Sequence, residues 1–189
     1  MRLSNYIYIK NFFSKEECEK VIKEGETNLK EATLIDNCIE TQIRDTKVSF
    51  IRNGSPVQDL MEKIIDQIVV EAKHHYGCNL KRFEPMQYTK YTKGMFYTWH
   101  TDSAVKIEDL VKNLRDISAS LILSPKEEHQ GGSLQMILNG CISKDNVVCP
   151  KDVQDQEQGT LIIFPSNVLH QVTPIISGTR KSLVIWGSS

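Results

Sequence analysis

The sequence lacks a cysteine framework. Its five cysteines, spread over 189 residues, are odd in number and form no C-x-x-C pair, which argues against a disulfide scaffold and against a structural zinc site. Small, buried or half-buried thiols in a reducing compartment are therefore expected.

Long apolar runs are also missing. Residues 1–6 contain no apolar stretch of the kind found in a secretory signal, and no run in the chain is long enough to cross a bilayer. We therefore expect a cytoplasmic protein with no membrane partner.

Neither sign of charge dominates. Lys and Arg number 23 and Asp and Glu number 24, which gives a net charge of −1. Because a basic excess is the usual footprint of nucleic-acid binding, a nucleic acid is not the expected partner. One local groove would nevertheless be enough for a single-stranded or nucleotide substrate.

What remains is an ordinary globular composition, with 40% hydrophobic and 25% charged residues. The length suits one domain with a sizeable core. We predict a single domain over residues 1–189, in which residues 1–78 form helical support and outer strands and residues 79–189 form the core.

Two helices are predicted in the supporting part. Ser14-Lys15-Glu16-Glu17 has the pattern of a capping box and predicts a helix through about Asn28. Ser55-Pro56 predicts the start of a second helix, with proline in its first position, and Gly77 predicts its end. Short strands are expected over Tyr6–Phe13, Thr33–Ile39 and Lys47–Ile51.

After Gly77 the pattern changes to short apolar strands separated by Gly and Pro. The candidates are Phe83–Tyr91, Met95–His100, Ile117–Leu123, Ser133–Ile137, Val147–Val148, Thr160–Phe164, Leu169–Thr173 and Ser182–Trp186. This series predicts a mostly β fold, a sandwich or jelly roll, with the helices packed outside the sheet. Residues 104–116, with a short helix or loop over 104–113, and the polar residues 144–158 are candidate lids.

The candidate metal ligands are His100, Asp102 and His170. One residue separates His100 from Asp102, so both side chains point to the same face of an extended strand. His170 follows an apolar strand and a Pro-Ser turn, and a jelly roll can bring it across to the first pair. Two histidines and one carboxylate can hold one face of a non-haem Fe(II) and leave the other face open.

The remaining histidines are expected to be surface residues. They are His74, His75 and His129. Trp99, next to His100 but on the other face, is expected in the core or in a wall of the site. Arg44 and Arg52 are expected to be solvated strand ends rather than parts of the entrance.

Arg180 is the candidate for holding a second, carboxylate-bearing co-substrate, because a guanidinium grips a carboxylate with two hydrogen bonds. Ser182 shares its strand face and can reach the same carboxylate. Tyr91 can add a phenolic hydrogen bond from a neighbouring strand. Alone, each of these three also fits an ordinary strand residue.

Many residues of the second half resemble, in order and spacing, the prolyl 4-hydroxylase group of Fe(II)/2-oxoglutarate dioxygenases, and most closely its PKHD-type hydroxylases. They are Gln87–Tyr91, Gly94, Tyr97, His100, Asp102, Ser118–Ser124, Gly131–Leu134, Phe164–Ser166, His170, Val172, Pro174, Gly178, Arg180, Ser182 and Trp186. Residues 9–18 match the opening of that group more loosely.

The resemblance implies a double-stranded β-helix, iron ligands at His100, Asp102 and His170, and Arg180 as the residue that binds the distal carboxylate of 2-oxoglutarate, helped by Tyr91. It also implies hydroxylation of an unactivated C–H bond with release of succinate and CO2, and possible use of ascorbate as reductant. Ile122 departs from the pattern, since some relatives carry an aromatic residue there.

The expected substrate is a peptidyl residue, with proline as the family-level expectation. Alternatives are the same chemistry on a free amino acid, a small metabolite or a nucleobase, or a non-catalytic jelly-roll binding protein. A cupin-type metal enzyme without 2-oxoglutarate would have no use for Arg180.

Overall fold

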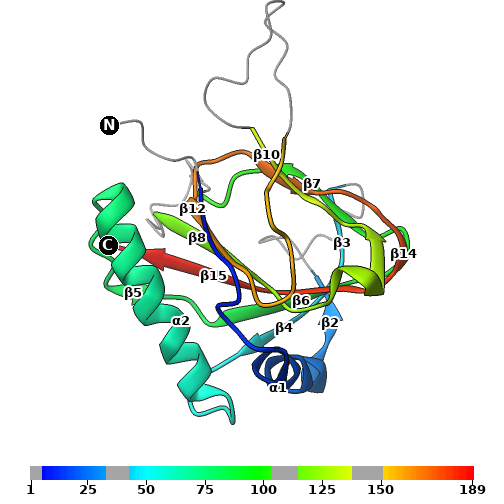
Figure 1. Cartoon of the computed structure of the whole chain (residues 1–189), viewed down its shortest axis with the longest axis horizontal. Helices are drawn as coiled ribbons and strands as arrows, with labels where there is room; N and C mark the ends of the chain where they lie inside the picture. Colours follow the sequence, from blue (N-terminus) through cyan, green and yellow to red (C-terminus); the bar gives the residue numbers. More distant parts are fainter. Residues whose placement is uncertain (1–5, 33–42, 104–114, 138–150) are drawn as a thin grey trace, which may run out of the picture.

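The computed structural model describes residues 6–32, 43–103, 115–137 and 151–189. Two antiparallel sheets face each other, and two helices lie outside the larger one (Figure 1). The predicted class, mostly β with supporting N-terminal helices in a jelly-roll arrangement, is confirmed. The predicted segments 33–39, 104–113 and 147–148 lie outside the described residues.

Over the described residues, the larger sheet has eight strands, and neighbouring strands in it are antiparallel. In spatial order its strands are β1 (Ile7–Ile9), β12 (Leu161–Pro165), β8 (Ile117–Ile122), β15 (Arg180–Ser188), β6 (Met86–Tyr91), β4 (Lys47–Ile51) and β2 (Lys30–Glu31), with β5 (Arg82–Phe83) paired to β15.

The smaller sheet covers part of the larger one. Its order is β11 (Lys151–Asp152), β10 (Leu134–Met136), β13 (His170–Val172), β7 (Phe96–His100) and β3 (Arg44–Asp45). A separate ribbon joins β14 (Ile175–Gly178) to β9 (His129–Gly131), and a short 3₁₀ turn, Lys126–Glu128, precedes it.

The two-residue period of a strand divides the larger sheet into two faces. Leu121 on β8 and Leu183 and Ile185 on β15 point toward the helices and belong to the main core. Their neighbours Ile122 and Phe164 point toward the smaller sheet and belong to a second apolar cluster. Arg180 and Ser182 alternate with Leu183 and Ile185 along β15. They therefore lie on the face of the larger sheet that is turned toward the smaller sheet.

The helices follow from their caps and apolar stripes. α1 (Lys15–Gly25) begins with the predicted capping box at Ser14, and a 3₁₀ turn, Glu26–Asn28, follows it. α2 (Gln58–Glu71) buries Met61, Ile64 and Ile68 against the sheet. It continues into a π turn, Ala72–Tyr76, that ends at Gly77 with a φ of 68°, as expected for a left-handed glycine cap.

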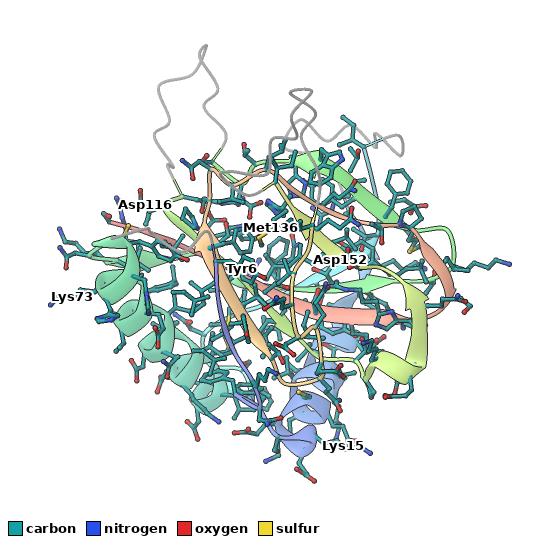
Figure 2. All side chains as sticks on the ribbon, turned by 45° about the horizontal axis from the view of Figure 1, so that its top comes forward. Tyr6, Lys15, Lys73, Asp116, Met136 and Asp152 are labelled. Atoms are coloured by element: carbon teal, nitrogen blue, oxygen red, sulfur yellow. The ribbon has the colours of Figure 1, made fainter. Side chains whose placement is uncertain are left out.

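Side-chain directions follow the same division. In Figure 2, Met136 lies inside, between the sheets, whereas Lys15 and Lys73 on the two helical segments point outward. Among the described residues, no helix has the length and apolar content needed to span a membrane.

Several predicted boundaries are wrong; for example, the strand predicted over Ser182–Trp186 runs over Arg180–Ser188. α2 begins at Gln58 rather than at Pro56, because residues 52–58 form consecutive turns closed by Ser55 N–Arg52 O and Gln58 N–Ser55 O bonds. The predicted strand 83–91 is split at Pro85, which has no N–H for a sheet bond. The first strand ends at Ile9, because a turn with Asn11 at a φ of 52° follows.

Candidate metal and co-substrate site

His100, Asp102 and His170 meet between the sheets. His100 ends β7 and lies opposite His170, the first residue of β13, while Asp102 follows two residues after His100. Their candidate ligand atoms all lie within 4.8 Å of one another. Asp102 Oδ1 is 3.7 Å from His100 Nε2, and Asp102 Oδ2 is 3.7 Å from His170 Nε2.

Both imidazoles are oriented in the same way. His100 Nδ1 lies 2.8 Å from the carbonyl oxygen of Thr98, and His170 Nδ1 lies 2.9 Å from that of Val168. A carbonyl only accepts, so each Nδ1 carries the proton, and each Nε2 is left with a free lone pair. This arrangement, with Nε2 turned to a shared carboxylate, is typical of histidines that bind a metal.

The electrostatics favour the protonation states that a metal requires. Burial, with a further contribution from His170, lowers the pKa of His100 to about 4, although Asp102 opposes the shift. Burial alone would raise the pKa of Asp102, but the two histidines and Ser118 lower it overall. At neutral pH the site therefore presents a neutral His100 imidazole and a charged Asp102 carboxylate.

Trp186 also borders Asp102. Its buried indole Nε1 has no hydrogen-bond partner among the described residues, yet it lies close enough to the carboxylate to contribute to the low pKa of Asp102. The N–H therefore acts on Asp102 as a nearby dipole rather than as a well-formed donor.

Tyr97 and Arg44 extend the site in a way that the sequence did not predict. The Tyr97 ring stacks on His100, with centroids 3.5 Å apart and planes 13° apart, and the Arg44 guanidinium lies 4.8 Å from the Tyr97 centroid. The expectation of a solvated Arg44 is wrong: the residue is half-buried, and its buried Nε has no hydrogen-bond partner in the part of the chain that the structure describes. Arg52 is exposed, as expected.

The missed stack has a structural cause. Tyr97 and His100 are three residues apart, so a regular strand would place them on opposite faces. The register against β13 shifts here, since His100 pairs with His170 but Tyr97 pairs with Val172. One extra residue on β7 therefore brings both rings to the same side, and the sequence carries no clear signal for this bulge.

Arg180 lies deep in the same inter-sheet space. The residue is 2% exposed, and burial lowers the pKa of its guanidinium, an effect that Tyr91 opposes. Nη1 donates to Ser182 Oγ at 3.0 Å, while Nη2 is buried without a partner among the described residues. Tyr91, opposite Arg180 on β6, has its ring 5.7 Å from the guanidinium carbon.

One cavity of about 1200 Å³ joins these groups, and its walls include the three metal-ligand candidates, Arg180, Tyr91 and Ser182. The donor set of two imidazoles and a carboxylate fits a non-haem Fe(II). The unpartnered Nη2 of Arg180 fits an incoming carboxylate, because a buried guanidinium requires an anionic or hydrogen-bonding partner. The residues present thus fit both iron and a dicarboxylic co-substrate.

The other predicted positions give mixed results. Ile122 is buried in the inter-sheet apolar cluster, which also contains Tyr91. His74 is exposed, as expected, while His75 is half-buried next to Glu71. His129 is half-buried, with Nδ1 3.0 Å from Gly131 O, rather than solvated.

Comparison with known proteins identifies the class. Residues 86–188, more than half of the chain, match the family described as the 2OG-Fe(II) oxygenase superfamily, and the chain belongs to that family. Among curated proteins, it is 28% identical over 127 residues to a PKHD-type hydroxylase of Shewanella baltica, covering 67% of this chain and 53% of that protein. It is 33% identical over 140 residues to a PKHD-type hydroxylase of Stenotrophomonas maltophilia, covering 72% and 57%.

The chain spans about half the length of the curated relatives it matches. Among solved structures, it resembles a Pseudomonas putida prolyl-4-hydroxylase, with a TM-score of 0.73 and 25% identity over 97% of this chain and 92% of that one. A Trichoplax adhaerens prolyl hydroxylase in complex with a hypoxia inducible factor peptide fragment has the same fold, with a TM-score of 0.76 and 18% identity over 97% and 83%.

Proposed function

We propose that this protein is an Fe(II)- and 2-oxoglutarate-dependent dioxygenase. Its proposed reaction is the hydroxylation of an unactivated C–H bond in a peptidyl residue such as proline. The observation that carries the proposal is the shared cavity: His100, Asp102 and His170 line it together with Arg180. Metal-binding groups alone would fit many hydrolases, whereas the buried guanidinium, with Nη2 unpartnered among the described residues, supports an anionic co-substrate in the same cavity.

In this assignment His100, Asp102 and His170 hold the iron, and Arg180 binds the distal carboxylate of 2-oxoglutarate. Ser182 orients the guanidinium through its hydrogen bond to Nη1, and Tyr91 contributes a hydroxyl from β6. The positive charges of the metal and the guanidinium balance the negative charges of the Asp102 carboxylate and the dianionic co-substrate. The buried complex is therefore neutral overall.

Iron with bound 2-oxoglutarate supplies the oxidation: O2 is consumed, 2-oxoglutarate becomes succinate and CO2, and a substrate C–H becomes C–OH. The chain contributes position and shielding. The two Nδ1–H···O bonds keep the imidazoles turned toward the metal. The Tyr97 ring covers one face of His100 and excludes water from it.

The size of the cavity supports a peptidyl substrate. Its volume of about 1200 Å³ exceeds the roughly 300–1,000 Å³ of sites that enclose a small molecule, so room remains after 2-oxoglutarate is bound. The similar Trichoplax protein is described in complex with a peptide fragment. A free amino acid would leave much of this volume to solvent.

The test combines co-substrate turnover with product analysis. Protein loaded with Fe(II) is incubated with 2-oxoglutarate, O2 and a library of proline-containing peptides, and succinate and peptide masses are measured. We expect succinate formation that depends on Fe(II), and a gain of one oxygen in some peptides. Oxygen gain only in free amino acids, metabolites or nucleotides would overturn the peptidyl assignment, and absence of succinate under all conditions would overturn the enzymatic one.

Three accompanying assignments are part of the same proposal. Ascorbate keeps the iron reduced, the setting is cytoplasmic, and residues 79–189 form the core of a single domain supported by residues 1–78. Free thiols at Cys18 and Cys78 support a reducing setting.

A further inference from the structure

The Asp102 carboxylate is held from the opposite sheet. Ser118 on β8 donates its hydroxyl to Asp102 Oδ2 at 2.6 Å. Ser118 has no exposed surface, and the distance lies in the range of strong hydrogen bonds to an ionised acceptor. Asp102 Oδ1, 3.7 Å from His100 Nε2, has no such donor among the described residues, while Oδ2 is also 3.7 Å from His170 Nε2.

Ser118 is itself held by Ser166. The two hydroxyl oxygens are 2.9 Å apart. A serine has one hydroxyl proton, and Ser118 uses its proton in the hydrogen bond to the carboxylate. Ser166 is therefore the donor in the hydrogen bond between the two serines. Ser166 is also fully buried, so the two serine hydroxyls that follow the carboxylate in this chain are shielded from water.

The backbone closes this chain into a ring. The carbonyl oxygen of Ser166 accepts from Asp102 N at 2.9 Å and from Ser103 N at 3.1 Å. Ser166 lies directly after β12, in the turn that leads to His170. The ring therefore connects the segment that carries Asp102 to the segment that carries the second histidine.

We propose that Ser118 is a positioning residue for the metal site: its hydroxyl holds Oδ2 so that Asp102 offers Oδ1 alone to the metal, and Ser166 keeps Ser118 in place. This inference rests on the proposed function. A carboxylate that bound through both oxygens would occupy one of the open positions that 2-oxoglutarate and O2 need. A fixed Oδ2 prevents this, because rotating the carboxylate would break a buried, charge-assisted bond.

Metal affinity without co-substrate is the sharpest test, because it does not depend on turnover. Co(II) alone is titrated anaerobically into the protein, and its visible absorbance reports both affinity and coordination number. Partners of metal ligands typically contribute about 10–100-fold to metal affinity. We expect Ser118→Ala to weaken Co(II) by about that factor and to change the band intensities, and Ser118→Thr, which keeps the hydroxyl, to retain most of the affinity.

Ser120→Ala is the matched control. Ser120 lies on the same strand and lines the same cavity, but no hydrogen bond joins it to the triad among the described residues. Its removal should change Co(II) affinity less than about twofold, a bound well below the roughly 10–100-fold range expected for a partner of a metal ligand. Ser166→Ala should weaken Co(II) in the same direction as Ser118→Ala but by less, because it acts through Ser118.

The outcomes separate this inference from the proposed function. Unchanged Co(II) affinity and spectrum in Ser118→Ala, or an equal loss in Ser120→Ala, would overturn the role of Ser118. Absence of Co(II) binding in the unaltered protein would instead overturn the metal site itself. If Ser118→Ala does not fold, Ser118→Cys keeps the volume with a weak donor, and wild-type affinity in that variant would equally refute the inference.

Discussion

Arg180→Met is the substitution whose outcome the structure constrains most tightly. Methionine has a similar length and no charge, so it removes the guanidinium and leaves most of the packing. Truncating one partner of a buried, hydrogen-bonded charge pair costs about 2–5 kcal/mol. At about 1.4 kcal/mol per factor of ten, the Kd for 2-oxoglutarate should rise roughly 30- to 4,000-fold, with metal affinity nearly unchanged.

The same substitution should have the opposite effect on the stability of the protein without co-substrate. Arg180 is then a buried cation whose Nη2 has no partner among the described residues, and such a charge destabilises the fold. We expect Arg180→Met to raise the Tm of that form, by roughly 2–4 °C for each kcal/mol gained in a chain of this size. Added 2-oxoglutarate should no longer raise the Tm.

Calorimetric titration of 2-oxoglutarate and thermal unfolding with and without it measure both effects. Lys181→Met is the control, since Lys181 is the next residue on β15 and its side chain lies 3.5 Å from the exposed Glu128. The reasoning is refuted if Arg180→Met binds 2-oxoglutarate as the unaltered protein does, or if it loses metal and co-substrate affinity equally, because Arg180 would then be a structural residue.

Substitutions around Arg180 and His100 should have graded effects. Tyr91→Phe should weaken 2-oxoglutarate binding about 12- to 140-fold, the equivalent of one hydrogen bond to a charged group of about 1.5–3 kcal/mol. An unchanged Kd would show that the Tyr91 hydroxyl does not contact the co-substrate. Gly132→Ala should lower both Tm and co-substrate affinity, because Gly132 has a φ of +71° and its added Cβ would lie 2.9 Å from Arg180 Cδ and closer still to Ile175; normal values of both would contradict the close approach. The free energy of unfolding of the metal-free protein, measured with urea, should fall as the pH is lowered from about 6.5 toward about 4, by up to about 1.4 kcal/mol per pH unit. In this range the His100 imidazole binds a proton in the unfolded chain, whereas burial keeps it neutral in the folded one. His100→Gln should flatten that dependence, and an equally steep curve would refute the assignment.

The faces of the strands could be predicted from the sequence, because a period of two is a local property. Arg180 and Ser182 share a face of β15 as the spacing indicates, and His170 meets His100 and Asp102 as a jelly roll allows. Asp102 joins His100 from a bend after β7 rather than from the strand itself, so its position does not follow from the strand period. Their roles as ligands and co-substrate contacts remain predictions, which the titrations above address.

Contacts that depend on irregular backbone could not be predicted. Tyr97 reaches His100 only through the bulge on β7. Arg44, at the end of a two-residue strand, has the pattern of a solvated residue, but stacking on Tyr97 buries its Nε. In both cases the controlling partner lies on another strand whose register no local pattern specifies.

The contacts of Ser118 and Ser166 with Asp102 could not be predicted from the sequence for a related reason. Ser118 lies in a predicted apolar strand, where a small residue normally indicates close packing. Its partners Asp102 and Ser166 are 16 and 48 residues away in the chain. Only the meeting of β8 with the two ligand-bearing segments makes Ser118 a neighbour of the carboxylate.

The most direct test of the whole account is an anaerobic titration of 2-oxoglutarate into the Fe(II)-loaded protein, followed by its visible charge-transfer absorbance. The account predicts a band that requires both Fe(II) and 2-oxoglutarate, saturates at one co-substrate per chain, and disappears in Asp102→Ala. It also predicts the same band in Arg180→Met, at far higher 2-oxoglutarate concentrations. A band that persists unchanged in Asp102→Ala, or no band in the unaltered protein, would contradict the claim that this cavity binds iron and 2-oxoglutarate together.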